Sequence, residues 1–155
     1  MSLEIERKFL VNHQKWNTIE KPNKYFIRQG YILTDPNKSI RIRQTETTAY
    51  LTIKGPAKCA SRSEFEYEIP LRDAEHLLNN FAVAELIKIR YKIVYKDKLW
   101  EVDVFLGDNS GLIVAEIELE SEIEFFELPP WIEGEVTGEE KYYNSSLSLH
   151  PFNKW

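Results

Sequence analysis

The sequence has few of the features that mark secreted or membrane proteins. Its 155 residues include one cysteine, Cys59, which cannot form an internal disulfide and which suits a reducing compartment. No apolar run approaches the roughly 20 residues that a transmembrane helix needs. The N-terminus, MSLEIERKF, is charged where a signal peptide would be apolar. We therefore expect a soluble cytoplasmic protein that does not act at a membrane.

The sequence also lacks a basic excess, internal repeats and low-complexity linkers. It has 20 lysine and arginine residues against 25 aspartate and glutamate residues, and the net charge of −5 argues against nucleic acid as a partner. Apolar residues make up 43% of the chain and aromatic residues 13%, which favours a folded chain over a disordered one. The length suits a single domain over residues 1–155 with a sizeable core.

Most of the chain alternates between apolar and polar residues with a period of two, which is typical of β-strands. Several links between these segments are short, so neighbouring strands are expected to be antiparallel. The predicted strands are Leu3–Val11, Tyr25–Leu33, Ser39–Gln44, Ala49–Lys54, Ser63–Ile69, Leu86–Tyr95, Lys98–Phe105 and Leu112–Glu120. This pattern predicts a mainly β (α+β) fold, a barrel or sandwich of about eight antiparallel strands with helices packed outside.

The predicted helices are few and short. Asp73 is expected to cap a helix that begins at Ala74, and Asn12 to cap a shorter one that carries Trp16 and Ile19. The C-terminal stretch GEEKYYNSSLSLH has room for one or two further helical turns, and LPPW before it reads as a loop.

Charged residues stand at every second position on the predicted strands, and they are sorted by sign. The apolar residue between them places both members of each pair on one face. After the first strand, which carries Glu4, Glu6 and Lys8, each strand has one sign only. The pairs are Arg41 and Arg43, Thr52 and Lys54, Glu64 and Glu66, Lys88 and Arg90, Glu101 and Asp103, and Glu116 and Glu118.

A single E-x-E or R-x-R stretch is most often a solvent-facing strand, but seven in series are not explained that way. Solvated faces usually mix signs, because like charges side by side are mildly destabilising. An eight-stranded barrel has an interior wide enough for one small ligand. We therefore predict that the charged rows line an enclosed space. The outer faces would be covered by helices and by an oligomer interface, such as that of a homodimer.

The two signs together indicate the kind of ligand. Carboxylates supply the oxygen ligands that Mg²⁺ or Mn²⁺ prefers, and arginine and lysine bind phosphate oxygens. A simple anion would leave the carboxylates without a partner, and a bare metal ion would leave the arginines without one. A small polyphosphate bound with a divalent metal satisfies both.

This series of motifs resembles the triphosphate tunnel metalloenzymes, or CYTH superfamily. The hallmark of that family is an N-terminal E-x-E-x-K strand, here Glu4, Glu6 and Lys8, followed by the same order of pairs and by a closing segment similar to EVTGEEKYYNSSL. The resemblance covers nearly the whole chain and implies a closed eight-stranded antiparallel tunnel that holds a triphosphate with metal. One departure is Lys141, where the family often has arginine before the tyrosine, so a phosphate-binding role for Lys141 is left open.

The resemblance also implies roles for individual residues. The metal would be held mainly by the first and last acidic strands, with further acidic residues completing the shell, and lysines and arginines would bind the phosphates. Lys8 and Tyr31 would help to orient the attacking water, although Tyr31 fits equally well as part of the wall. The implied metal ligands are Glu4, Glu6, Glu64, Glu66, Asp103, Glu116 and Glu118, and the implied phosphate ligands are Lys8, Arg41, Arg43, Lys54, Lys88 and Arg90.

Three functions are compatible with these residues. The first is metal-dependent hydrolysis of inorganic triphosphate to diphosphate and phosphate, since short bacterial chains that begin this way most resemble the tripolyphosphatases of the family. The second is a nucleotide or thiamine triphosphate enzyme, including an adenylate cyclase, for which the sequence shows no clear pocket for a base. The third is a polyphosphate-binding module without catalysis, which the complete metal-ligand rows make less favoured.

Overall fold

The alternating segments form strands along most of the chain, and all eight predicted strands are confirmed with ends within two residues. The computed structural model describes residues 2–35, 37–56, 58 and 60–155, so Cys59 lies outside the described residues. Within them the strands are β1 (Ser2–Val11), β2 (Lys24–Leu33), β3 (Ser39–Gln44), β4 (Ala49–Lys54), β5 (Ser61–Ile69), β6 (Ala84–Tyr95), β7 (Lys98–Phe105), β8 (Ile113–Glu118) and β9 (Ile132–Glu135).

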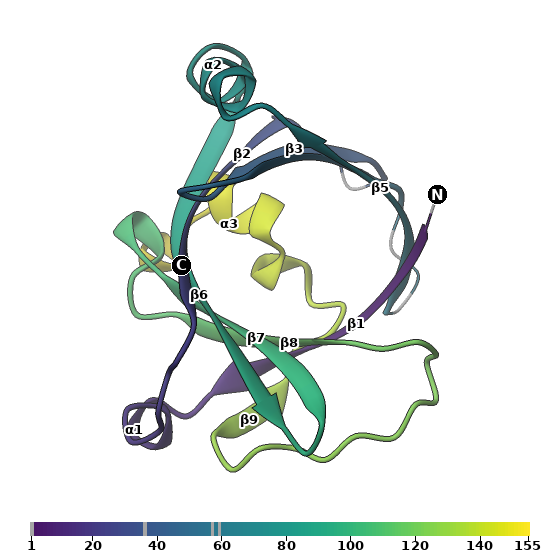
Figure 1. The fold of residues 1–155 in the computed structure, drawn as a ribbon, viewed down its shortest axis with the longest axis vertical. Helices are drawn as coiled ribbons and strands as arrows, with labels where there is room; N and C mark the ends of the chain where they lie inside the picture. Colours follow the sequence, from purple (N-terminus) through teal and green to yellow (C-terminus); the bar gives the residue numbers. More distant parts are fainter. Residues whose placement is uncertain (1, 36, 57, 59) are drawn as a thin grey trace.

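The strands close into a barrel. The order is β5-β4-β3-β2-β6-β7-β8-β1-β9, each paired antiparallel to its neighbours, and β5 also pairs with β1. The closed circle therefore contains the eight predicted strands. β9, which follows the LPPW loop and was not predicted, pairs with β1 outside the circle (Figure 1).

The two helices in the first half of the chain pack outside the barrel. In α1 (His13–Trp16) the Asn12 side chain accepts a hydrogen bond from the Lys15 amide at 2.9 Å, which confirms the predicted cap, while Ile19 lies beyond the helix end. In α2 (Leu71–Phe81) the prediction of an Asp73 cap was wrong. The helix begins three residues earlier than expected, after Pro70, whose fixed φ of −59° suits a helix start.

Helix α2 covers the outer faces of β2, β3 and β4. Its buried residues Ala74 and Leu78 pack against Ile42 and Ala49, which point away from the charged face of their strands. Gly30 allows this close approach, because a Cβ there would lie 2.6 Å from the Leu78 side chain. The outer faces of β1, β7 and β8 are covered by α1 and by the segment between β8 and β9, with a cluster of aromatic residues between them. This cluster contains Phe9, Trp16, Trp100, Phe126 and Trp131.

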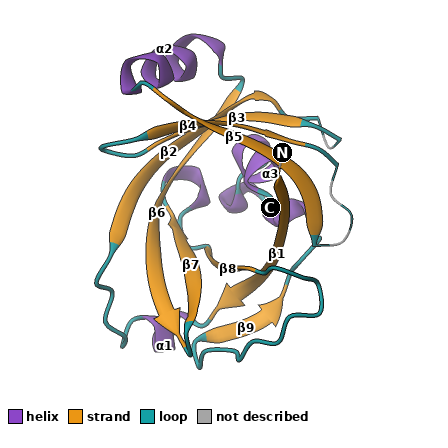
Figure 2. Ribbon diagram, turned by 45° about the vertical axis from the view of Figure 1, so that its right-hand side comes forward, coloured by secondary structure: helices purple, strands orange, loops and turns teal. Residues whose placement is uncertain are grey.

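The C-terminal helix is different, because α3 (Asn144–Leu149) lies inside the barrel outline in both ribbon views (Figures 1 and 2). Its Leu147 is fully buried against Leu86, Phe105 and Val114. These three residues continue the inward-facing rows of β6, β7 and β8. Short 3₁₀ turns flank α3 at Glu140–Tyr142 and Phe152–Lys154, and another lies at Gly107–Asn109. The inner face is therefore apolar at one end, where the C-terminal segment fills it, and charged beyond.

Within the described part of the chain, no helix combines the length and the apolar character needed to span a bilayer.

Candidate active site

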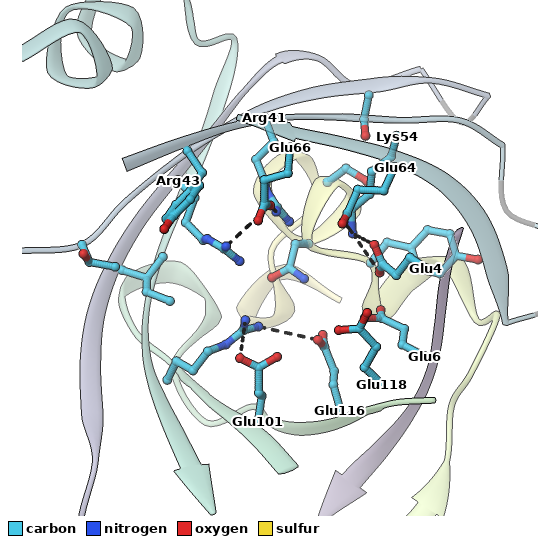
Figure 3. Close-up of a pocket in the computed structure, with 18 of the residues that line it drawn as sticks. Glu4, Glu6, Arg41, Arg43, Lys54, Glu64, Glu66, Glu101, Glu116 and Glu118 are labelled. Carbon is cyan, nitrogen blue, oxygen red and sulfur yellow. Dashed lines mark hydrogen bonds and ion pairs between the residues drawn. The ribbon is translucent and has the colours of Figure 1, made fainter. Parts of the chain in front are cut away.

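The charged rows line a cavity of about 510 Å³ inside the barrel (Figure 3). One end is bounded by Tyr143, Asn144 and Ser145 of the C-terminal segment. The other end reaches Tyr25 and Thr47, whose exposure marks the mouth. The predicted residues that line it are Glu4, Glu6, Lys8, Tyr31, Arg41, Arg43, Lys54, Glu64, Glu66, Arg90, Glu116 and Glu118. Most of the predicted residues are thus brought together.

One wall of the cavity is acidic. Glu6 lies directly opposite Glu118 in the β1–β8 pairing, and Glu4 points toward the same place (Figure 3). Partial burial raises the pKa of Glu118, and the charges of Glu4, Glu101 and Glu6 raise it further. Like charges directly opposite on paired strands are destabilising. This wall therefore carries an excess of negative charge that a cation would relieve.

The acidic wall suits a hard divalent cation by its chemistry. Glu4, Glu6 and Glu118 offer only carboxylate oxygens, which Mg²⁺ and Mn²⁺ prefer. Among the residues that the structure describes, no three acidic, histidine or cysteine side chains are arranged so that they could hold a metal ion. Instead, the Glu4 carboxylate forms an ion pair with Lys54 Nζ at 2.6 Å. The Glu116 carboxylate lies 3.5 Å from Lys8 Nζ and 3.6 Å from the Arg90 guanidinium.

The opposite wall is basic and carries an excess of positive charge. Burial lowers the pKa of Arg43 to about 10, and the nearby charges of Arg41 and Arg90 contribute in the same direction. Arg41 Nε is buried and has no hydrogen-bond acceptor among the described residues. A buried donor without a partner is costly. An anion between these three guanidinium groups would relieve both penalties.

Ion pairs join the two walls across β3, β4, β5 and β1. Glu66 lies 3.5 Å from Arg41 and 3.6 Å from Arg43, and it also accepts a hydrogen bond from Thr52 at 2.8 Å. Lys54 lies 3.6 Å from Glu64 in addition to its contact with Glu4. Charges of opposite sign thus neutralise one another in part, which explains how the cavity is tolerated without a ligand.

Lys8 and Tyr31 are buried polar residues that line the cavity. Burial lowers the pKa of Lys8, but Glu116 and other carboxylates outweigh it, so that the net effect is a raised pKa. Its Nζ also donates to the Tyr142 carbonyl oxygen at 3.3 Å. Burial raises the pKa of Tyr31, whose hydroxyl accepts a hydrogen bond from Gln29 at 2.9 Å. Both groups are therefore protonated near neutral pH, so each has a proton with which it can donate a hydrogen bond.

Two predicted site residues are not among the described residues that line the cavity. Lys88 and Asp103 are each 1% exposed and lie behind the cavity wall. Lys88 Nζ lies 2.7 Å from Asp103 and 3.0 Å from the Asn144 side-chain oxygen of α3. Arg90 donates to both oxygens of Asp103, at 2.8 and 2.9 Å. The Asp103 carboxylate is thus fully used by two cations and does not face the acidic wall.

Among the lining residues that sequence reasoning missed are Arg62, Lys92, Tyr143 and Asn144. Arg62 lies two positions before Glu64 and falls on the inner face, because β5 begins at Ser61 and not at Ser63. Extending the alternation by two residues would have found Arg62, and likewise Lys92, two positions after Arg90. Tyr143 and Asn144 come from the irregular C-terminal segment, which gave no such signal.

Lys141 does not line the cavity in the described structure. Its Nζ lies over the Trp155 ring at 4.5 Å from the centroid and near the Tyr142 ring at 5.2 Å. The position that departs from the family pattern therefore contributes a cation–π contact at the C-terminus.

Comparison with known proteins agrees with this geometry. The model of the CYTH domain matches residues 2–150. An inorganic triphosphatase of Acetivibrio thermocellus is 44% identical over 156 residues, covering 100% of this chain and 99% of that protein. One from Nitrosomonas europaea is 38% identical over 151 residues, covering 94% and 97%. The crystal structure of the inorganic triphosphatase NE1496 has a TM-score of 0.65 at 35% identity, covering 96% of each chain.

Proposed function

We propose, because this chain belongs to the CYTH domain family, that it hydrolyses inorganic triphosphate to diphosphate and orthophosphate in the barrel cavity, with Mg²⁺ or Mn²⁺ as cofactor. The observation that supports this most is the separation of charge in one cavity. Burial and nearby carboxylates raise the pKa of Glu118 on one wall, and burial and nearby arginines lower the pKa of Arg43 on the other. A metal-bound triphosphate offers the cation and the anion that these walls lack.

In this proposal the basic wall binds the triphosphate chain. Arg41, Arg43 and Arg90 present guanidinium groups that match phosphate oxygens, and the unpartnered Arg41 Nε gains an acceptor. Because the groups are held by Glu66 and Asp103 before the substrate arrives, little reorganisation is needed when charge shifts during phosphoryl transfer.

Glu4, Glu6 and Glu118 would hold the divalent cation in the proposed enzyme. When bound, such an ion neutralises phosphate charge and lowers the pKa of a coordinated water. Glu64 is a further carboxylate close to Glu4, because Lys54 forms ion pairs with both of them. Once Glu4 binds the metal ion, Lys54 would lose its ion pair with Glu4 and could bind a phosphate oxygen instead.

Lys8 and Tyr31 would fix the attacking water and the phosphoryl oxygens as hydrogen-bond donors. Their raised pKa values keep the ammonium and the hydroxyl protonated near neutral pH. We assign Lys88 and Asp103 to positioning. They hold Arg90 and Asn144 from behind the wall and are not assigned to direct contact with phosphate or metal.

We expect tripolyphosphate to be hydrolysed with a kcat/KM about tenfold or more above that of ATP or thiamine triphosphate. The charged walls serve all three substrates, but a base must find further contacts at the mouth. There the Arg43 side chain lies over the Tyr50 ring at 5.7 Å and the Lys92 side chain over the Tyr25 ring at 5.1 Å. A stacking base would have to displace these cations. The measurement is steady-state phosphate release for each substrate with Mg²⁺ and with Mn²⁺.

The same assay separates the competing functions. Cyclic AMP is measured in parallel, and its accumulation from ATP as the preferred substrate would replace hydrolysis by a cyclase activity. If tripolyphosphate binds tightly and is not consumed with either metal, the chain is a binding module.

We expect Arg43→Ala to lower kcat/KM for tripolyphosphate and for ATP by about 10²–10³. Arg43 is one of the three guanidinium groups on the basic wall, so its loss removes about a third of the arginine charge that would bind the phosphates. Arg28→Ala is the matched control, since Arg28 pairs with Glu85 on the outer face of β2 at 2.8 Å. A loss confined to ATP would place Arg43 in a nucleotide subsite instead.

A further inference from the structure

The barrel wall has a seam beside Glu6 and Lys8, because one edge of β1 is shared by two partners. Residues Ser2–Ile5 pair with β5, and the Glu6 amide still donates to the Ala60 carbonyl oxygen at 3.0 Å. Further along, Phe9 and Val11 pair with β9. Between these partners the Lys8 amide donates to the Thr137 side-chain oxygen at 2.9 Å. At Lys8 the wall is therefore closed by this side-chain hydrogen bond and by one backbone bond, from the Val136 amide to the Lys8 carbonyl oxygen at 2.8 Å, and not by a paired strand.

A second cavity of about 30 Å³ lies at this seam. Glu6, Lys8, Arg62 and Tyr143 line both this cavity and the large one, so the two spaces adjoin along these four residues. On the outer side a Cβ at Gly138, which also lines the cavity, would meet no atom within 4 Å. One water needs about 10–15 Å³ of such space, so the seam admits water as it stands.

The groups between the two cavities suit a small anion. The Lys8 ammonium lies 5.7 Å from the centroid of the Tyr143 ring, and the Arg62 guanidinium lies 5.8 Å from the same centroid. Arg62 forms no ion pair with any residue that the structure describes, so its charge is available. An anion leaving the large cavity at this point would pass between two cations and displace one aromatic ring.

The position of the seam matters for product release. The C-terminal segment fills the barrel behind Lys8, whose Nζ contacts the Tyr142 carbonyl oxygen. A phosphoryl group cleaved near Lys8 and Arg62 would have the remaining diphosphate, held by the arginines of the basic wall, between itself and the mouth.

We propose that the β5–β9 seam is a side portal through which orthophosphate leaves while diphosphate still occupies the cavity. The Tyr143 ring closes this portal until it moves aside. The inference rests on the proposed hydrolysis. One water adds to the terminal phosphorus, the bond from that phosphorus to the bridging oxygen breaks, and diphosphate, orthophosphate and a proton result. Orthophosphate passes only when the Tyr143 and Arg62 side chains move, because the opening otherwise holds water alone.

The test blocks the portal from outside with Ser61→Trp. Ser61 lines the small cavity, lies on the outward face of β5 and does not line the large cavity. In single turnovers with enzyme in excess, acid quench measures cleavage and a fluorescent phosphate-binding protein measures release. We expect cleavage within about twofold of wild type and orthophosphate release about tenfold slower, coincident with diphosphate release. Ser110→Trp, at an exposed turn before β8, is the matched control and should behave as wild type.

A second measurement uses added orthophosphate as an inhibitor. In wild type it should lower kcat, because it re-enters through the portal behind bound diphosphate. In Ser61→Trp it should only raise KM, because it must then compete at the mouth. Tyr143→Ala should release orthophosphate at least as fast as wild type.

Unchanged release and unchanged inhibition in Ser61→Trp, with normal cleavage, would overturn the portal and leave the proposed hydrolysis standing. Absence of tripolyphosphate cleavage by the wild-type chain with either metal would overturn both.

Discussion

Glu6→Gln is expected to lower kcat for tripolyphosphate by at least about 10³ while leaving the metal-free fold intact. Glutamine keeps the size of the side chain but removes one of the three charges that would hold the cation. It also removes the repulsion between Glu6 and Glu118, which lie opposite each other on β1 and β8. The variant without metal should therefore unfold at the same temperature as wild type or higher, since such pairs are worth about 0.2–1 kcal/mol.

Two measurements distinguish a loss of metal binding in Glu6→Gln from a loss of folding. Mn²⁺ should raise the unfolding temperature of wild type and not that of Glu6→Gln, because a ligand stabilises the state that binds it. Glu75→Gln, on the exposed face of α2, is the control and should match wild type in both readouts. Near-normal turnover by Glu6→Gln at limiting Mg²⁺ would remove Glu6 from the metal site.

The fold was largely predictable because period-two alternation is a local property. Each strand from β1 to β8 carries its own inward and outward rows, and short links fix their antiparallel pairing. β9 has only four residues and follows Pro129 and Pro130, so its alternation is too short to stand out. The place of α3 inside the barrel depends on the apolar ends of distant rows, such as Leu86 and Val114, which no local pattern connects to Leu147.

The candidate site was predictable where it depends only on which side chains of a strand point into the barrel. Alternation places Arg41, Arg43 and Glu66 inside, and the structure brings them together. It does not tell how deep a residue lies along the barrel axis. Lys88 and Arg90 belong to one row, yet only Arg90 reaches the cavity, because Asn144 of the inserted C-terminal segment covers Lys88. Depth depends on the closure of the barrel and on what fills its end.

Asp103→Asn is expected to destabilise the protein by about 3–5 kcal/mol, a large share of the stability of a domain. The amide is nearly isosteric, but it leaves Lys88 and Arg90, both buried, without their shared counter-charge. Equilibrium unfolding in urea at pH 7 measures the loss. Asp108→Asn, at an exposed turn, should change the free energy of unfolding by less than about 0.5 kcal/mol.

The dependence on pH identifies the cause of that loss. Burial raises the pKa of Asp103, but Arg90 and Lys88 outweigh it and hold the pKa well below the usual range. A carboxylate with a lowered folded-state pKa contributes stability above its unfolded pKa of about 3.9, and this contribution is lost as the pH falls. The part of the difference in unfolding free energy between wild type and Asp103→Asn that comes from this carboxylate should therefore shrink as the pH falls below about 4.

A double variant tests whether unpaired charge, and not lost packing, carries the effect. Lys88→Met in the Asp103→Asn background removes one of the two uncompensated cations and keeps an apolar chain of similar length. It should recover part of the lost stability, because a buried charge without a partner costs more than the well-packed apolar group that replaces it. If the double variant is less stable than Asp103→Asn alone, the Lys88 ammonium has another partner at least as strong. The Asn144 side-chain oxygen, at 3.0 Å, would then be that partner, and α3 would be held in the barrel chiefly through Lys88.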